Sequence, residues 1–461
     1  MKKAQKNIFA NYQKTIGVIS FLVLLVIVSI SFKPAGNAAP WGPNLSYVDQ
    51  HYPDFNYLPS PADYQGRVFT LSQHYPMQEP DASLRPEFMK IDFKKNWKEY
   101  LLAAQDYCFK DNVLGGDVAN DFDAALRPDP TWFHVPWQHY GPSGREGIHG
   151  LTKEAPVNPQ QIAISQTYKG GQFYAVGLYN IFGGYTIGKV WADKEHPNAK
   201  DIRFPEGTVV MKVLFTEIPP GQVPFLVNPL IWRGYITQSY TVTNRVDTTL
   251  ALVQMDLMVK DSRAPGGWVF GNYQYNGAMN NANKWKNLVP LGIMWGNDPD
   301  VNDGTWGQYT NPVPVVTRIN PALKETIINP DVNELPPTHL GWNGRLNGPA
   351  DNYLSSCMSC HMTAQAPTKS PMSPLFYPNP SQVPVVGSKG WMRWFQNLKC
   401  GDRFDADKPT SSTDFSLQLA ASLQNFYNWR NMGSKTSAER YKKNQGNKSD
   451  PEQEFEVKRS Q

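Results

Sequence analysis

Short runs of β-type residues fill the middle of this 461-residue chain, from residue 161 to about residue 298, and Gly, Pro, Asn and Asp turns separate them. The clearest strands are predicted at 208–216, 250–260 and 268–275. Within 250–260, apolar residues alternate with mainly polar ones, which predicts an apolar face turned inward and a mainly polar face turned outward. No long helical segments separate the runs, as parallel crossovers would require, so we expect an antiparallel sheet or sandwich.

Three further segments have clear local patterns. Residues 173–191 are aromatic and β-branched but are interrupted by Gly183 and Gly184, which predicts two strands joined by a turn. Residues 93–112 carry apolar side chains at three- and four-residue intervals, the spacing of an amphipathic helix. A second helix is predicted over 417–430, after cap-type residues at 411–414. The predicted fold class is therefore mainly β, with peripheral α-helices and long loops.

The content of Gly and Pro indicates how these elements are connected. With 35 Gly and 39 Pro, one large β-rich domain with long connections is favoured over several small domains. The expected regions are an N-terminal signal or anchor (1–38), a loop-rich region with one helix (39–160), the antiparallel β core (161–300), a loop-rich region with the C-terminal helix (301–432) and a charged, disordered tail (433–461).

The first 39 residues have the layout of an export signal. Four lysines within residues 2–14 precede a mostly apolar run at 16–32, and small residues follow at 35–39. The run has 17 residues, at the lower limit of roughly 17 to 25 for a bilayer-spanning helix. We expect cleavage near Ala38, with a retained N-terminal membrane anchor as the alternative. Either arrangement places the remainder in a periplasmic or other extracytoplasmic space.

The charge balance excludes one class of partner. The chain has 44 Lys and Arg against 40 Asp and Glu, and residues 1–38 hold five of the basic residues and no acidic residue. The exported part therefore has 39 basic and 40 acidic residues. This near-neutral, dispersed charge gives no electrostatic basis for binding nucleic acid, so no nucleic-acid partner is expected.

Five consecutive residues carry the most specific chemical signal. Cys357, Met358, Ser359, Cys360 and His361 match C-x-x-C-H, the pattern for attaching haem c. Two thiols separated by two residues can reach the two vinyl groups of one porphyrin, and the adjacent imidazole is then held over the iron. We therefore expect one covalently attached haem c, bound through Cys357 and Cys360, with His361 as the metal ligand.

Two other functions compete for these cysteines. A thioredoxin-like pair needs a strand followed by a helix that begins at the first Cys, whereas Pro336, Pro337 and Gly348 predict a loop there. A zinc site would recruit Cys108 and Cys400, which are too scattered to form a second close pair. In an exported chain we instead expect Cys108 and Cys400 to form a disulfide, with two separate buried thiols as the alternative.

The ligand opposite His361 decides what such a haem does, and the sequence leaves several candidates. Met372, Met392 and Met432 lie downstream, and five histidines lie between residues 74 and 196. A methionine or histidine in that position favours plain electron transfer, whereas an open or lightly capped site favours chemistry on a small ligand.

One resemblance to a known family rests on the order of several motifs: FPEGTVVMK at 204–212, Tyr179-Asn180 before it, the strands around 255–260 and 268–275 after it, and then C-x-x-C-H. Over roughly residues 173–361 this order resembles the β-sheet cytochromes of the cytochrome P-four-sixty and cytochrome c-prime-beta group. The resemblance implies an antiparallel sheet with a C-terminal haem c. It also implies a choice of activities, since some members cross-link a lysine to the porphyrin and oxidise hydroxylamine, and others bind small gases.

Lys212 and one loop are further candidates. Lys212 shares a strand face with Val210 and Leu214, which would bring it near an apolar haem pocket, where desolvation would lower its pKa and favour the neutral, nucleophilic amine. The alternative is a lysine that extends outward from an edge strand. A Gly/Pro-broken loop gathers imidazole and guanidinium groups that would line a substrate approach, hold haem propionates or simply pack: His134, Trp137, His139, Arg145, Glu146 and His149.

The sequence thus predicts an exported monohaem c-type cytochrome that works in electron transfer, because it has one attachment motif and no specific catalytic constellation elsewhere. One alternative is a haem oxidoreductase that acts on a small nitrogenous or peroxide substrate at an open haem face. Another is a gas-binding haem module without turnover. The sequence identifies neither a redox partner protein nor a substrate.

Overall fold

A computed structural model of the chain describes residues 48–49, 52–53, 59–60, 62–65, 68, 73–110, 122, 132–138, 145–163, 165–168, 171–237, 245–299, 323–331 and 340–431. These residues belong to one compact unit, 42–461. The predicted signal, His139, Met432 and the tail at 433–461 lie outside the described residues. Within the described ranges we find no helix with the length and apolar character needed to span a bilayer.

A nine-stranded sheet forms the centre of the unit, and its strand order is β11-β10-β9-β8-β6-β5-β3, with β4 paired to β5 and β7 paired to β8. All of these pairings are antiparallel, which confirms the predicted fold class. The strands are β3 (Trp132–Phe133), β4 (Thr152–Lys153), β5 (Phe173–Asn180), β6 (Val209–Thr216), β7 (Ile231–Thr237), β8 (Arg245–Lys260), β9 (Trp268–Tyr275), β10 (Leu288–Met294) and β11 (Thr326–Ile328). Two small sheets pair β1 (Val48–Asp49) with β2 (Tyr52–Pro53) and β12 (Gln365–Ala366) with β13 (Ser411–Ser412).

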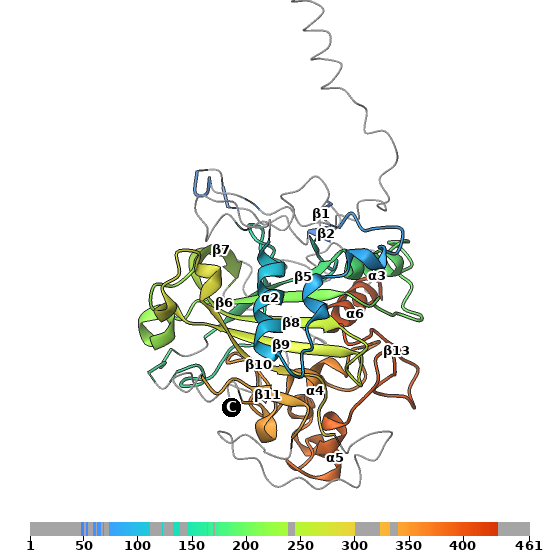
Figure 1. Cartoon of the computed structure of the whole chain (residues 1–461). Helices are drawn as coiled ribbons and strands as arrows, with labels where there is room; N and C mark the ends of the chain where they lie inside the picture. The colour runs from blue at the N-terminus through green and yellow to red at the C-terminus, as the bar shows by residue number, and fades with distance from the viewer. Residues whose placement is uncertain are drawn as a thin grey trace, which may run out of the picture. The chain divides into compact units, whose positions relative to one another are not determined.

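Short helices surround the sheet (Figure 1). The α-helices are α2 (Trp97–Phe109), α3 (Ile181–Val190), α4 (Cys357–His361), α5 (Lys389–Met392) and α6 (Leu417–Asn431). Single 3-10 turns occur at Ala82–Leu84, Glu87–Lys90, Pro220–Gln222, Pro224–Leu226, Gly277–Met279, Lys284–Asn287, Trp342–Gly344, Pro374–Phe376, Pro380–Gln382 and Arg393–Phe395. Both predicted helices are present. The cap of α6 is Ser416, whose Oγ accepts a hydrogen bond from the Leu419 amide at 3.0 Å.

The segment after β5 is a helix, so the prediction of a second strand in 173–191 is wrong. Asn180 ends β5 and caps α3, because its Oδ1 accepts a hydrogen bond from the Gly183 amide at 3.3 Å. The glycines serve close packing rather than a turn. A Cβ on Gly184 would lie 2.5 Å from Cδ2 of Phe133, so α3 can approach β3 only because this position has no side chain.

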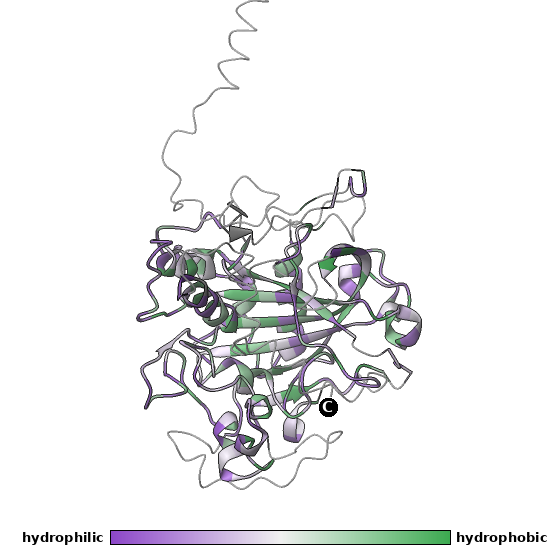
Figure 2. Ribbon diagram, turned by 180° about the vertical axis from the view of Figure 1, so that it is seen from behind, coloured by the Kyte–Doolittle hydropathy of each residue, from purple (hydrophilic) through white to green (hydrophobic). Residues whose placement is uncertain are grey.

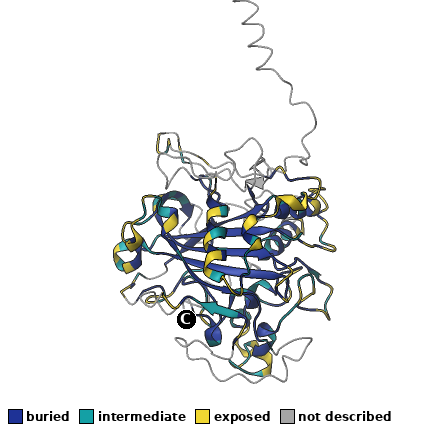
Figure 3. Cartoon of the chain, viewed as in Figure 1, coloured by how far each residue is buried: buried dark blue, intermediate teal, exposed yellow. Residues whose placement is uncertain are grey.

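Both faces of the sheet are covered (Figure 3). On one face α2 lies across the strands, and the Tyr273 hydroxyl donates to the Leu101 carbonyl at 2.7 Å. On the other face lie α4 and the start of α6, where the Tyr179 hydroxyl is 2.7 Å from Ser416 Oγ. The central strands are correspondingly apolar, while hydrophilic residues gather in helices and loops around them (Figure 2).

The predicted outward face of β8 is therefore not exposed, which corrects the sequence interpretation. Gln254 is fully buried and Met258 is 6% exposed, although both alternate with the inward-facing residues Met255 and Leu257. The residues after 340 cover this face and bring the C-x-x-C-H motif onto it. A buried polar sheet face needs partners for its side chains, and these partners form the site described next.

Candidate haem site

The C-x-x-C-H motif forms the one-turn helix α4, which a capping box begins. Ser356 Oγ accepts from the Ser359 amide at 3.1 Å, and Ser359 Oγ accepts from the Ser356 amide at 2.8 Å. Ser356 Oγ also donates to Oδ1 of Asn297 at 2.8 Å, just beyond β10, and the Cys357 amide donates to the Leu346 carbonyl at 3.1 Å. The attachment motif is thus tied to the sheet and to the loop before it.

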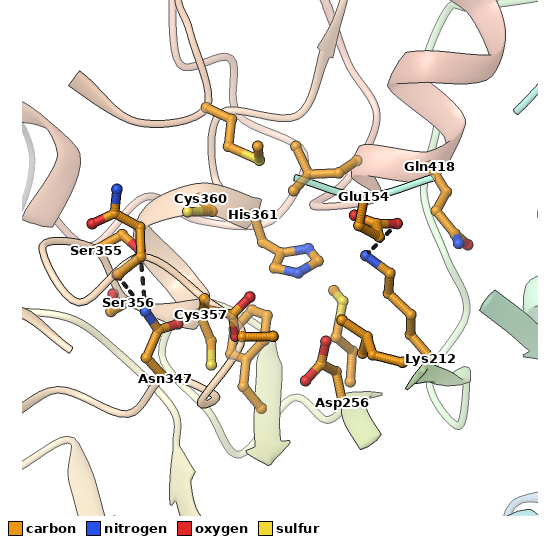
Figure 4. Close-up of a pocket in the computed structure, with 18 of the residues that line it drawn as sticks. Glu154, Lys212, Asp256, Asn347, Ser355, Ser356, Cys357, Cys360, His361 and Gln418 are labelled. Atoms are coloured by element: carbon orange, nitrogen blue, oxygen red, sulfur yellow. Dashed lines mark hydrogen bonds and ion pairs between the residues drawn. The ribbon is translucent and has the colours of Figure 1, made fainter. Parts of the chain in front are cut away.

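One cavity lies between the sheet and α4, and Cys357, Cys360 and His361 all line it. Figure 4 shows the imidazole of His361 between the two cysteines on one side and the Lys212–Glu154 ion pair on the other. Apolar side chains make up much of the remaining wall: Phe173, Val210, Leu214, Met258, Phe270, Met372 and Phe376. The three residues of the predicted haem site are therefore brought to a common cavity.

The ring of His361 has a defined orientation. Its Nδ1 lies 2.9 Å from the backbone carbonyl of Phe415, so Nδ1 carries the proton and donates it. Burial lowers the pKa of His361 to about 4, which keeps the ring neutral. The lone pair is then on Nε2, and a neutral imidazole with its other nitrogen bound to a carbonyl is the usual state of a histidine that ligates a metal.

The two cysteines are half-buried, protonated thiols. Burial raises the pKa of Cys360 to about 12 and raises that of Cys357 well above its usual range, with the charges of Asp351 and Asp256 adding to the effect at Cys357. A thiol–disulfide redox pair needs the opposite shift, since the thiolate is the nucleophile in exchange. Neutral thiols beside an imidazole suit covalent attachment of a porphyrin better than redox exchange of the thiols.

A cluster of charged side chains forms the floor of the cavity. Lys212 on β6 lies directly opposite Asp256 on β8 in the strand register. Its Nζ forms an ion pair with Glu154, at 2.9 Å from Oε1. Gln254 Nε2 donates to Asp256 Oδ1 at 2.6 Å and to Asp351 Oδ2 at 3.1 Å, so one amide joins two carboxyl groups. Burial and the neighbouring Asp351 raise the pKa of Asp256 to about 8. Asp256 is therefore harder to ionise than an ordinary aspartate.

The location of Lys212 agrees with the hypothesis that it lies near the haem pocket, but its predicted charge state is wrong. Burial alone would lower the pKa of Lys212, yet the charges of Glu154 and Asp256 outweigh burial and raise the pKa above its ordinary value. The side chain is an ammonium group without a lone pair. It is therefore unsuited to act as a nucleophile or as an iron ligand while its carboxylates are ionised.

The candidate ligands opposite His361 differ in whether they line the cavity. Met372 lines the cavity together with Phe376, whereas Met392 is fully buried in α5 and is not part of the cavity wall. None of the four described histidines from the 74–196 region lines the cavity either. Among the predicted methionine candidates that the structure describes, Met372 is the one that lines the cavity.

The loop around His149 packs as ordinary structure. Arg145 donates to the Val135 carbonyl at 2.7 Å, and the Glu146 carboxylate accepts from the His149 amide at 2.7 Å. The His149 ring stacks on Trp232, with 4.3 Å between ring centroids. No described member of the predicted cluster lines the cavity. The packed-loop interpretation therefore agrees with the structure as to packing, although both ring nitrogens of the buried His134 have no hydrogen-bond partner among the described residues. A role in holding propionates in this cavity does not agree with it.

The remaining cysteines lie in different parts of the fold. Cys108 is buried in α2 within the hydrophobic core, and Cys400 approaches the β8–β9 turn, where a Cβ on Gly267 would be 2.6 Å from its Sγ. No disulfide joins these two described residues in the structure. Within the described ranges, no group of three or more His, Cys, Asp and Glu side chains is arranged to hold a metal ion. The Cys108–Cys400 disulfide stays a prediction.

Three acidic residues of this site were not singled out from the sequence. Asp256 belongs to the face of 250–260 that alternation predicts to be outward, and its position on that strand is the available signal. Glu154 and Asp351 follow no motif, and only the packing of separate loops onto the sheet brings them to Lys212.

Comparison with protein-family models, curated proteins and solved structures finds no match to this chain. The resemblance to the cytochrome P-four-sixty and cytochrome c-prime-beta group therefore stays a prediction. The function has to be inferred from the residues of the site and their geometry.

Proposed function

We propose that this chain is an exported, monohaem c-type cytochrome that transfers electrons. The observation that carries the proposal is the state of His361: its Nδ1–H is committed to the Phe415 carbonyl, and its Nε2 remains available in a cavity that both motif cysteines line. A haem c in this cavity would supply one-electron redox chemistry at its iron.

The chain has separate roles for its own residues at such a site. Cys357 and Cys360 would form the thioethers, and His361 would ligate the iron through Nε2. The Phe270 ring lies 5.4 Å from the His361 ring, and Val210 and Leu214 add apolar side chains to the wall of the same cavity. Burial of an iron site among apolar side chains and a fixed hydrogen bond to the ligating imidazole are two of the ways in which a protein sets a reduction potential.

The test is covalent haem attachment, followed by redox titration. After export with a haem-attachment system, the wild-type protein should keep its haem on denaturation and show a reversible one-electron couple. Cys357→Ala/Cys360→Ala should lose covalent haem, while Cys108→Ala, a matched control outside the cavity, should retain it. A colourless wild-type protein with the mass of the bare polypeptide would refute the proposal.

A second candidate, a haem oxidoreductase acting on a small molecule, is supported by one observation. Plain electron transfer needs no titratable groups in the cavity, yet Glu154, Lys212, Asp256 and Asp351 all line it. Such groups can give protons to, or take them from, a substrate that changes its protonation as it is oxidised or reduced.

Binding of cyanide and nitric oxide separates the candidates. Rapid binding with consumption of a small nitrogenous or peroxide substrate would favour the oxidoreductase. Tight binding without consumption would favour a gas-binding module. A strictly six-coordinate haem that binds neither cyanide nor nitric oxide would favour electron transfer.

A further inference from the structure

We propose that Lys260 and Asp414 form a buried clamp that positions the proximal ligand, by holding the strained turn that presents the hydrogen-bond acceptor to His361. The inference rests on the proposed haem function. Neither Lys260 nor Asp414 touches the imidazole, so both are positioning residues rather than catalytic residues.

The acceptor for His361 belongs to an unusual turn between β13 and α6. Asp414 and Phe415 have φ values of 51° and 69°, so two consecutive residues other than glycine adopt the left-handed conformation. Residues with side chains rarely adopt this conformation, and it persists only where the surrounding structure enforces it. The carbonyl that receives the His361 Nδ1–H at 2.9 Å is that of Phe415, the second residue of this turn.

Lys260 holds the first residue of the turn. Its Nζ lies 2.9 Å and 3.0 Å from the two carboxylate oxygens of Asp414, and it lies 4.9 Å from the ring centroid of Trp268. The Asp414 side chain is fully buried, and that of Lys260 is 10% exposed. The Phe204 amide adds a hydrogen bond to Asp414 Oδ2 at 2.7 Å. The carboxylate is thus held from the end of β8 and from the loop before β6.

This arrangement links the sheet to the ligand through a short, continuous path. Lys260 is the last residue of β8, the strand that also carries Asp256 into the cavity floor. Through Asp414 it fixes the turn, and through the Phe415 carbonyl the turn fixes the imidazole. A strong acceptor at Nδ1–H makes a ligating imidazole a better electron donor, which stabilises ferric over ferrous iron.

The experiment measures the reduction potential and the iron–histidine vibrational band in Lys260→Met and Asp414→Asn, after haem content has been verified. We expect both variants to favour ferrous iron by about tenfold, a positive shift of about 59 mV for a one-electron couple. The vibrational band should move to lower frequency. Lys260→Arg keeps the cation and should restore most of the wild-type potential.

A matched control removes another buried ion pair. Asp405 is fully buried and pairs with Arg393 at 2.7 Å, so Asp405→Asn should lower Tm without shifting the potential or the vibrational band.

If Lys260→Met does not fold, Lys260→Gln keeps a hydrogen-bond donor toward Asp414 and should give a smaller shift in the same direction. Folded, haem-loaded variants with unchanged potential and vibrational band would overturn the clamp. A wild-type protein without haem would instead overturn the proposed function.

Discussion

Lys212 on β6 and Asp256 on β8 are direct cross-strand partners, and they stand on the sheet face that the C-x-x-C-H segment covers. The same row continues to Gly177 on β5 and to Asn272 on β9. A Cβ on Gly177 would lie 1.9 Å from Nε2 of Gln418, so the missing side chain leaves room for α6 beside Lys212. Lys212 and Asp256, the two central residues of this row, line the candidate haem cavity.

Replacing Asp256 by Asn should change how stability depends on pH. The pKa of Asp256 rises from 3.8 to about 8 because of burial and the nearby Asp351. Since the folded pKa lies above the unfolded value, the folded state holds the proton more tightly, and this stabilisation is complete below about pH 4 and lost as pH rises toward 8. Asp256→Asn is neutral at every pH, so its Tm should fall less than that of the wild type between about pH 5 and pH 8. Parallel melting curves for the two proteins would contradict the assigned shift.

Replacing Lys212 by Met should destabilise the fold, because it removes the ion pair between Lys212 and Glu154. The two side chains are 28% and 24% exposed, so solvent screening limits the expected loss in the free energy of unfolding to ~1–2 kcal/mol. Lys212→Met/Glu154→Gln should recover part of that loss. The control is Lys98→Met, which breaks an exposed pair with Asp331 and should cost ~0–1 kcal/mol in urea denaturation. Equal losses in Lys212→Met and Lys98→Met would show that the Lys212–Glu154 pair stabilises the fold no more than an exposed ion pair does.

The two described methionine candidates should respond differently to truncation. Met372 lines the cavity, so Met372→Ala should change the optical spectrum of the ferric protein and speed cyanide binding. Met392 is fully buried outside the cavity wall, so Met392→Ala should cost ~2–5 kcal/mol in unfolding free energy and leave the spectrum unchanged. A spectral change in Met392→Ala alone would reverse this assignment.

Adding a methyl group at Gly184 should destabilise the fold even though alanine favours helices. The new Cβ would lie 2.5 Å from the Phe133 ring. Overpacking of this kind costs ~1–3 kcal/mol, which exceeds the gain of ~1 kcal/mol in helix propensity. Gly221→Ala is the control, since nothing lies within 4 Å of a Cβ at that position. Chemical denaturation should show a loss for Gly184→Ala and little change for Gly221→Ala; an equally stable Gly184→Ala would contradict the close contact between α3 and β3.

Local patterns predicted much of the sheet but failed where packing decides. Trp268–Tyr275 is a strand over the same residues as predicted, because alternation and flanking turns are properties of the local sequence. The residues after Asn180 form a helix, because a side-chain cap and close contacts with β3 outweigh their β-branched and aromatic composition. The polar face of β8 is buried, which local alternation cannot reveal, since the covering segment begins some 80 residues later along the chain.

Two thiols and an imidazole at fixed spacing need only a single helical turn, so the sequence alone placed Cys357, Cys360 and His361 together and predicted haem c as their cofactor. The antiparallel sheet was likewise evident from alternation and turns. Only the tertiary structure decided that the Phe415 carbonyl accepts a hydrogen bond from His361 Nδ1, that Lys212 is held as an ammonium group and that Met372 lines the cavity. The first two relationships join residues 54 and 58 positions apart, and the third belongs to a cavity wall. Contacts of this kind depend on how the sheet is covered rather than on any local preference of the chain.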